Sequence, residues 1–143
     1  SENDIKSFSM TGQRRDLNRE KFKLDNLLSV LNNPESNANK NLKYLRNAMD
    51  VRSELKQFHP CSEMKCLSKG RSDIVVIKRS KGPESVFAIH NMTENKINYQ
   101  LNDNDLPKII DNDFNTHDFL TSTKYNCKNI SLDPFQVIWL SAL

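Results

Sequence analysis

A run of nine residues near the start of the chain carries the side chains best suited to chemistry. The stretch TGQRRDLNR, residues 11–19, contains three arginines, an aspartate and an asparagine, with hardly an apolar side chain to bury. Arginine presents a rigid fork of donors, and nearby carboxylate and amide groups can hold that fork in place. Such a loop can bind a polyol or an anion. The alternative is a solvated loop before a helix, the usual role of a short basic run.

The other polar residues form no recognisable catalytic set. No histidine has a Ser or Cys beside it in a nucleophile motif, and three glycines are too few for a Gly-rich phosphate loop. A metal site would have to combine His59, Cys61, Cys66 and Cys127. Their spacing, H-x-C-x4-C, matches no standard zinc pattern, and free cysteine often behaves as a small buried hydrophobe. We therefore expect no metal, no cofactor and no self-contained enzyme.

Composition narrows the class of protein further. With 143 residues the chain is sized for one domain, or for a domain plus an appendage. A net charge of +3, with acidic residues scattered throughout, makes a nucleic-acid partner unexpected. No apolar run is long enough for a membrane span, and the first residues lack the layout of a signal peptide. An odd number of cysteines favours a reducing compartment, so we expect a cytoplasmic protein.

The elements that must position these residues begin with two helices. From Leu24 to about Phe58 the apolar residues recur at helical spacing. A short helix should start at Lys23 or Asp25 and stop near the sequence NNPES. A longer helix should follow, with Ser36 as its cap. Its apolar stripe consists of Ala38, Leu42, Leu45, Met49 and Leu55. The helix should stop at the sequence FHP, because proline forces the residue before it out of the helical region.

Beyond Cys61 the apolar period changes to two, which predicts strands. Residues 73–92 read as a hairpin around SKGPES, residues 96–101 alternate cleanly, and HDFLTS reads as a short strand or turn. The end of the chain reads as one or two strands around Asp133 and Pro134. Its two faces are Phe135, Val137 and Trp139 on one side and Ile138 and Leu140 on the other. We expect an antiparallel sheet of about five or six strands, with Trp139 buried.

The order of several short motifs along the chain matches that of a known enzyme group. They are END…TGQRRDLNREKF, a short helix, a long helix ending RSELKQFHP, then SVFAIHNMT, DFL and ISLDPFQVIWL. In this order they resemble the C-terminal end of the sucrose phosphorylase group of the α-amylase superfamily, whose members include glucosylglycerate phosphorylases. The resemblance covers nearly the whole chain. Its most specific parts are GQRRDLNR and the closing LDPFQVIWL, where the family has a similar apolar strand after a proline.

The resemblance implies an α+β fold. Enzymes of this family are (β/α)8 barrels with a small antiparallel β domain at the C-terminus. They transfer glucose from an α-glucoside to phosphate with retention, using a carboxylate nucleophile and a carboxylic acid/base. Residues 1–60 would form an N-terminal loop and two helices that end the barrel, and residues 61–143 a small antiparallel β-sheet or sandwich domain. The catalytic carboxylates would lie upstream, so this chain alone should be inactive.

The resemblance also gives the basic loop a role. The loop would follow the eighth barrel strand, at the end where barrel active sites are assembled. The family arginine that contacts the glucosyl unit matches Arg15, while Asp16, Asn18 and Arg19 match the rest of the motif and would brace the loop. The family often has GRDINR where this chain has GQRRDLNR, so the choice between Arg14 and Arg15 stays open. The implied partners of the full-length enzyme are a sugar substrate and phosphate.

Two hypotheses of different class follow. The chain is either the non-catalytic C-terminal part of a sugar phosphorylase, or a free-standing β module with a helical arm that binds a carbohydrate or a protein. The stripe of Leu42, Leu45 and Met49 discriminates between them. In the first case it should be left exposed, and the isolated chain should self-associate or pack its helices on the β domain. In the second case the sheet should cover it.

Overall fold

The computed structural model describes residues 2–12, 23–106 and 115–142. Within it, the chain divides into two compact units, Ser1–Leu45 and Arg46–Leu143, and the boundary falls inside a long helix. The boundary predicted at residue 60 rests on a different property, the change from helical to strand periodicity, and stays a prediction. Each of the two units has its own set of internal contacts.

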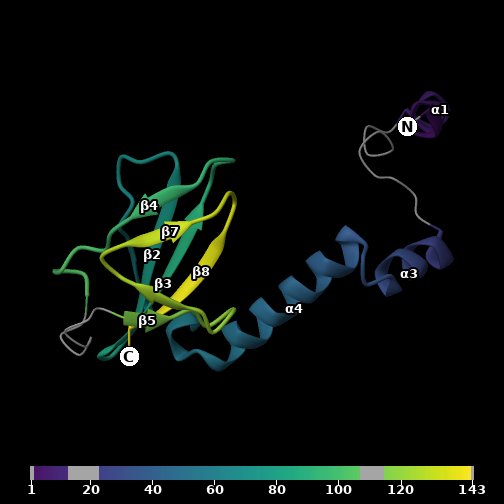
Figure 1. Cartoon of the computed structure of the whole chain (residues 1–143). Coiled ribbons are helices and arrows are strands. Elements are labelled where there is room, and N and C mark those ends of the chain that lie inside the picture. Colours follow the sequence, from purple (N-terminus) through teal and green to yellow (C-terminus); the bar gives the residue numbers. More distant parts are fainter. Residues whose placement is uncertain (1, 13–22, 107–114, 143) are drawn as a thin grey trace. The chain divides into compact units, whose positions relative to one another are not determined.

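The helices occupy the first part of the chain (Figure 1). They are α1 (Glu2–Thr11), α3 (Leu24–Asn32) and α4 (Asn37–Glu54). The two helices predicted from the apolar pattern, α3 and α4, are confirmed. Ser36 is the cap of α4, as predicted, because its Oγ accepts a hydrogen bond of 3.0 Å from the backbone N–H of Asn39. The helix ends earlier than the sequence indicates: Leu55 has an extended backbone, and the short 3-10 helix η1 (Lys56–Phe58) follows it.

The strands form one larger sheet and two ribbons. The larger sheet has the order β1-β2-β3-β8, and every pairing in it is antiparallel. Its strands are β1 (Glu63–Cys66), β2 (Ile74–Lys81), β3 (Glu84–Asn91) and β8 (Val137–Ala142). The predicted hairpin is β2 and β3, in which Lys81 pairs with Glu84. Between them Gly82 has a φ of 61°, a conformation that glycine adopts without strain.

The two ribbons pair strands of three residues each. Strand β4 (Ile97–Tyr99) pairs with β7 (Ile130–Leu132), and β5 (Asn115–His117) pairs with β6 (Lys124–Asn126). The described part of the chain therefore has eight strands in three sheets, where the sequence indicated about five or six strands in one sheet. Three residues are too few to display a period of two, which is why β5 and β6 are not distinguished in the sequence. The antiparallel α+β architecture itself is confirmed.

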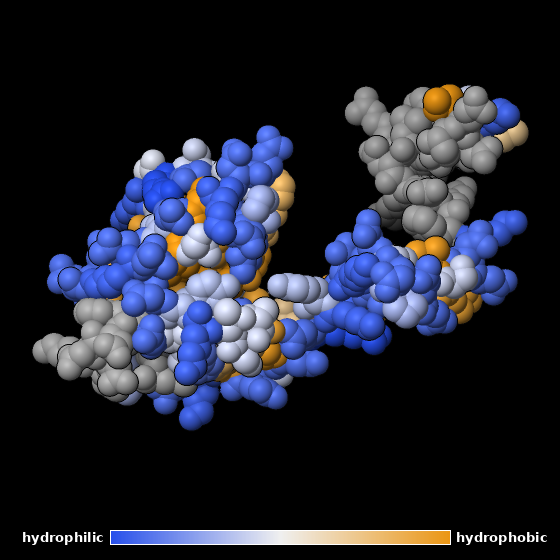
Figure 2. Space-filling view, viewed as in Figure 1, coloured by the Kyte–Doolittle hydropathy of each residue, from blue (hydrophilic) through white to orange (hydrophobic). Residues whose placement is uncertain are grey.

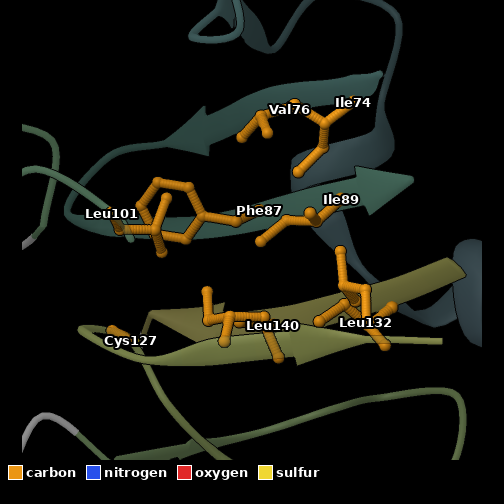
Figure 3. Close-up of a cluster of buried hydrophobic side chains, with 10 residues drawn as sticks. Ile74, Val76, Phe87, Ile89, Leu101, Cys127, Leu132 and Leu140 are labelled. Atoms are coloured by element: carbon orange, nitrogen blue, oxygen red, sulfur yellow. The ribbon is translucent and has the colours of Figure 1, made fainter. Parts of the chain in front are cut away.

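The core lies in the second unit. Its buried side chains come from both the larger sheet and the β4–β7 ribbon, and Figure 3 shows them gathered in one cluster. They are Ile74, Val76, Phe87, Ile89, Leu101, Cys127, Ile130, Leu132, Ile138 and Leu140. Strand β3 is the centre of the sheet, since it pairs with β2 on one side and β8 on the other.

The final strand differs from its predicted pattern in two places. Ile138 and Leu140 are fully buried, as a strand docked on the core requires. Trp139 was expected to be buried but is half-buried, with its ring 4.6 Å from that of Phe58. Phe135 was expected on the same face as Trp139, yet it lies outside β8, is 65% exposed and has a φ of 54°. The turn after Pro134 takes Phe135 out of the strand, so its side chain does not share the strand's alternation.

A buried amide connects two loops of this unit. Asn91, 2% exposed, donates from Nδ2 to the carbonyls of Asn95 and Asp133, at 2.7 and 2.8 Å. Its Oδ1 accepts from the backbone N–H and the hydroxyl of Thr93, both at 2.9 Å. All the hydrogen-bonding capacity of the side chain is used, so Asn91 links the turn after β3 to the turn before β8.

The substitution Asn91→Ala should therefore lower the free energy of unfolding by about 2–3 kcal/mol, because it leaves several backbone groups without partners. Urea unfolding followed by circular dichroism measures this loss. Asn95→Ala is the matched control, since Asn95 is exposed and contributes only its backbone carbonyl to Asn91. Equal unfolding midpoints for the two variants would contradict the role assigned to Asn91.

Cys127 allows an independent test of the core. Burial raises the pKa of its thiol to about 11, whereas Cys61 and Cys66 are exposed. Ellman's reagent at pH 8 should therefore modify two of the three cysteines in the folded chain, and Cys127 only after unfolding. The raised pKa also makes the free energy of unfolding fall as pH rises from 9.0 toward about 11. In this range the Cys127 thiol loses its proton in the unfolded chain but keeps it in the folded chain, so deprotonation favours unfolding. Rapid reaction of all the thiols in native buffer would refute this placement.

Candidate functional site

The basic loop predicted to bind a sugar follows directly after α1. That helix ends at Thr11, and Gly12 has a φ of 65°, the left-handed conformation common just past a helix end. Four predicted site residues, Arg15, Asp16, Asn18 and Arg19, lie outside the described residues, as does Arg14. Their role therefore stays a prediction.

The apolar faces of the helices are the most prominent surface of the described chain. Up to position 45, none of the side chains whose exposure the structure describes is buried. On α3, Leu24 and Leu28 are 66% and 45% exposed, and on α4 Leu45 is 59% exposed. Figure 2 shows hydrophobic surface, in orange, over α3. Within the first unit, the helices thus have apolar side chains for one half of a core, and no described residue of that unit supplies the other half.

The helices of the first unit nevertheless hold each other by polar bonds. Ser36 donates from its hydroxyl to the carbonyl of Val30 at 2.6 Å, and Asn39 donates from Nδ2 to the carbonyl of Leu31 at 2.5 Å. These bonds satisfy carbonyls at the end of α3, which a helix leaves without partners of its own. The turn between α3 and α4 is therefore well defined, although the apolar faces of both helices remain open.

A second feature is a hollow where α4 meets η1, which we call the α4–η1 hollow. It measures about 480 Å³. Its lining residues are Met49, Arg52, Ser53, Glu54, Leu55, Lys56, Phe58 and His59. Met49, 60% exposed, belongs to the apolar stripe of α4, so the hollow continues that stripe. The ring of Phe58, which lines the hollow, packs at a tilt of 43° against that of Trp139, with the centroids 4.6 Å apart. The indole nitrogen of Trp139 is buried without a hydrogen-bond partner among the described residues.

The hollow is held firmly by the β2–β3 hairpin. Gln57, 2% exposed, donates from Nε2 to a carboxylate oxygen of Glu84 at 2.8 Å. Arg79 donates from Nε to the carbonyl of Gln57 at 3.1 Å and from Nη2 to that of His59 at 2.7 Å. These bonds fix the chain between α4 and β1, so the hollow has a definite shape before anything binds to it.

The histidines and cysteines do not meet in a site. Cys127 is buried in the core, while His59, Cys61 and Cys66 are exposed. Within the ranges that the structure describes, no three side chains of the metal-binding types are grouped around one point. His90, on β3, is half-buried, and this burial lowers its pKa, which keeps the ring neutral.

Comparison with known proteins reveals the fold but no close relative. No family model matches the chain, and no curated protein matches it. No helix among the described residues is both long and apolar enough to cross a membrane.

Solved structures do match. The trehalose-6-phosphate hydrolase TreA of Bacillus licheniformis is 17% identical, with a TM-score of 0.57 over 78% of this chain and 19% of its own. The trehalulose synthase MutB is 13% identical, with a TM-score of 0.60 over 80% of this chain and 19% of its own. A MutB mutant has been solved with its substrate sucrose. At such identities the likeness is one of fold alone. The chain spans about a fifth of the length of these proteins, and it has the fold of a small α+β region of each of them.

Proposed function

We propose that this chain is the non-catalytic C-terminal part of a retaining α-glucoside phosphorylase of the sucrose phosphorylase type. Such an enzyme transfers glucose to phosphate and gives α-glucose 1-phosphate. One observation carries the proposal: the helices have open apolar faces, whereas the β unit has a complete core of its own. Apolar faces of this kind are covered in a stable protein, and the missing body of a barrel would cover them.

The kind of enzyme is proposed from two further observations. The fold is shared with proteins whose names describe action on trehalose 6-phosphate or formation of trehalulose, and with a MutB mutant that binds sucrose. The motif GQRRDLNR resembles the arginine loop of sucrose phosphorylases. In this proposal Arg15 contacts the glucosyl unit, Asp16, Asn18 and Arg19 brace the loop, and the partners are a sugar and phosphate. The enzyme would be cytoplasmic and would need no cofactor.

The other hypothesis, a free-standing β module that binds a carbohydrate or a protein, has less support. It requires the stripe of α4 to be covered from within the chain. Leu45 and Met49 are 59% and 60% exposed, and the other three residues of the stripe are half-buried, so none of the stripe is buried. A module that folds and works alone seldom leaves such a surface in water.

The open stripe predicts that the isolated chain self-associates. Sedimentation velocity over a range of concentrations should show species larger than a monomer. The double variant Leu45→Gln and Met49→Gln should shift the distribution toward monomer, since glutamine keeps the helix and the approximate side-chain size while removing the apolar surface. Asn41→Gln, at an exposed position of the same helix, is the matched control. A strict monomer for the unmodified chain at every concentration would contradict this prediction.

The proposal also predicts how activity divides between the chain and its parent. The 143-residue chain alone should release no glucose 1-phosphate from an α-glucoside, because the nucleophile and the proton donor would both be missing. In the full-length parent, Arg15→Ala should lower transition-state stabilisation by a few kcal/mol, the scale of a charged hydrogen bond in a desolvated site.

Lys21→Ala is the control for that experiment and should leave kcat/KM nearly unchanged. Turnover by the isolated chain would refute the proposed role. An Arg15 variant as active as the parent would show that Arg14, or neither arginine, contacts the sugar.

A further inference from the structure

A second hollow, on the β unit, has the character of a ligand site. It measures about 390 Å³, within the range of small-molecule sites. The lining residues are Arg71, Asn98, Tyr99, Gln100, Lys128 and Asn129. They come from the loop before β2, from β4 and from the connection between β6 and β7, and Figure 1 shows β4 and β7 side by side. We call this feature the β4–β7 hollow.

The two cations of this hollow are already neutralised. Arg71 donates from Nε to Asp73 at 2.8 Å and from Nη2 to the other oxygen of the same carboxylate. The hydrogen bond from Arg71 lowers the pKa of Asp73, so the pair stays charged at neutral pH. Lys128 forms an ion pair with Asp103. An anion entering the hollow would have to compete with both carboxylates, which disfavours an anionic ligand.

The groups left to bind a ligand are neutral amides. The side chains of Asn98, Gln100 and Asn129 are exposed, and none has a hydrogen-bond partner among the described residues. Each amide offers two N–H donors and a carbonyl acceptor. A ligand that matches them needs several groups that both donate and accept, which is the chemistry of sugar hydroxyls.

Tyr99 and Arg71 form one side of the hollow. The ring of Tyr99 packs against the hydrophobic core, and the guanidinium carbon of Arg71 lies 5.6 Å from its centroid. This cation–π contact and the bonds to Asp73 together hold Arg71 in place. The bonds to Asp73 use Nε and Nη2, so Nη1 is a further donor beside the three amides.

We propose that the β4–β7 hollow binds a neutral carbohydrate of one or two rings at a surface distinct from the arginine loop. The site has amide donors and acceptors in excess, internally paired charges and a rigid wall. It is open to water and largely lacks apolar contact area, so the binding should be weak, with a Kd in the millimolar range. The inference stands on the β unit alone and does not rest on the proposed phosphorylase function.

The test uses the 143-residue chain labelled with ¹⁵N and titrated with maltose, a neutral disaccharide. The side-chain amide resonances of Asn98, Gln100 and Asn129 should shift and saturate together. The double variant Asn98→Ala and Gln100→Ala should bind about tenfold more weakly, the loss of two neutral hydrogen bonds. Asn129→Ala tests the same hollow from the β6–β7 connection, should the double variant fail to fold. Asn41→Ala, an exposed amide on α4, should bind like the unmodified chain.

A parallel titration with sodium sulfate separates a carbohydrate site from an anion site. Saturable shifts of these resonances with sulfate, and none with maltose, would overturn the proposal. Unchanged resonances in maltose, or equal affinity in the Asn98 and Gln100 variant, would also overturn it. Maltose binding at this hollow together with a parent that performs no phosphorolysis would refute the proposed function and leave this site standing.

Discussion

The need to cover apolar surface governs this chain more than any other constraint. In the β unit the requirement is met internally, because β3 pairs on both edges and its buried side chains pack with those of β7 and β8. In the helical part it is not met by the described residues: α3 and α4 have apolar faces and no buried position. The same chain therefore contains one finished core and one unfinished core, and its proposed place in a larger enzyme follows from that difference.

Buried polar groups give the β unit its definite shape. Asp118 is fully buried and accepts hydrogen bonds from the backbone N–H of Trp139 at 2.7 Å and from the hydroxyl of Thr121 at 2.7 Å. Asn91 and Gln57 act in the same way at other turns. Each of these side chains ties an irregular segment to the larger sheet. The α4–η1 hollow is built on a segment held like this, since Gln57 lies between its lining residues Lys56 and Phe58, so that surface exists before a ligand or a partner arrives.

The two polar surfaces of the chain differ in how their charges are arranged. The sequence of residues 11–19 has three arginines and one aspartate, an excess of positive charge that fits its proposed role in binding a substrate. In the β4–β7 hollow each cation has its own carboxylate, and the free groups are amides. The first arrangement favours strong, oriented binding, and the second favours weak binding of a neutral polyol.

The sequence by itself determined the local elements. The helices α3 and α4, the cap at Ser36 and the β2–β3 hairpin follow from apolar periods and turn residues acting over a few positions. It also determined the motif containing Arg15, Asp16, Asn18 and Arg19. Only the tertiary structure decided that Phe135 leaves its strand, that Trp139 packs against Phe58, and which side chains of α4 stay exposed. It alone assembled the β4–β7 hollow, because Arg71, Tyr99 and Asn129 meet through pairing between strands far apart in the chain, and such pairing leaves no periodic signal in the sequence.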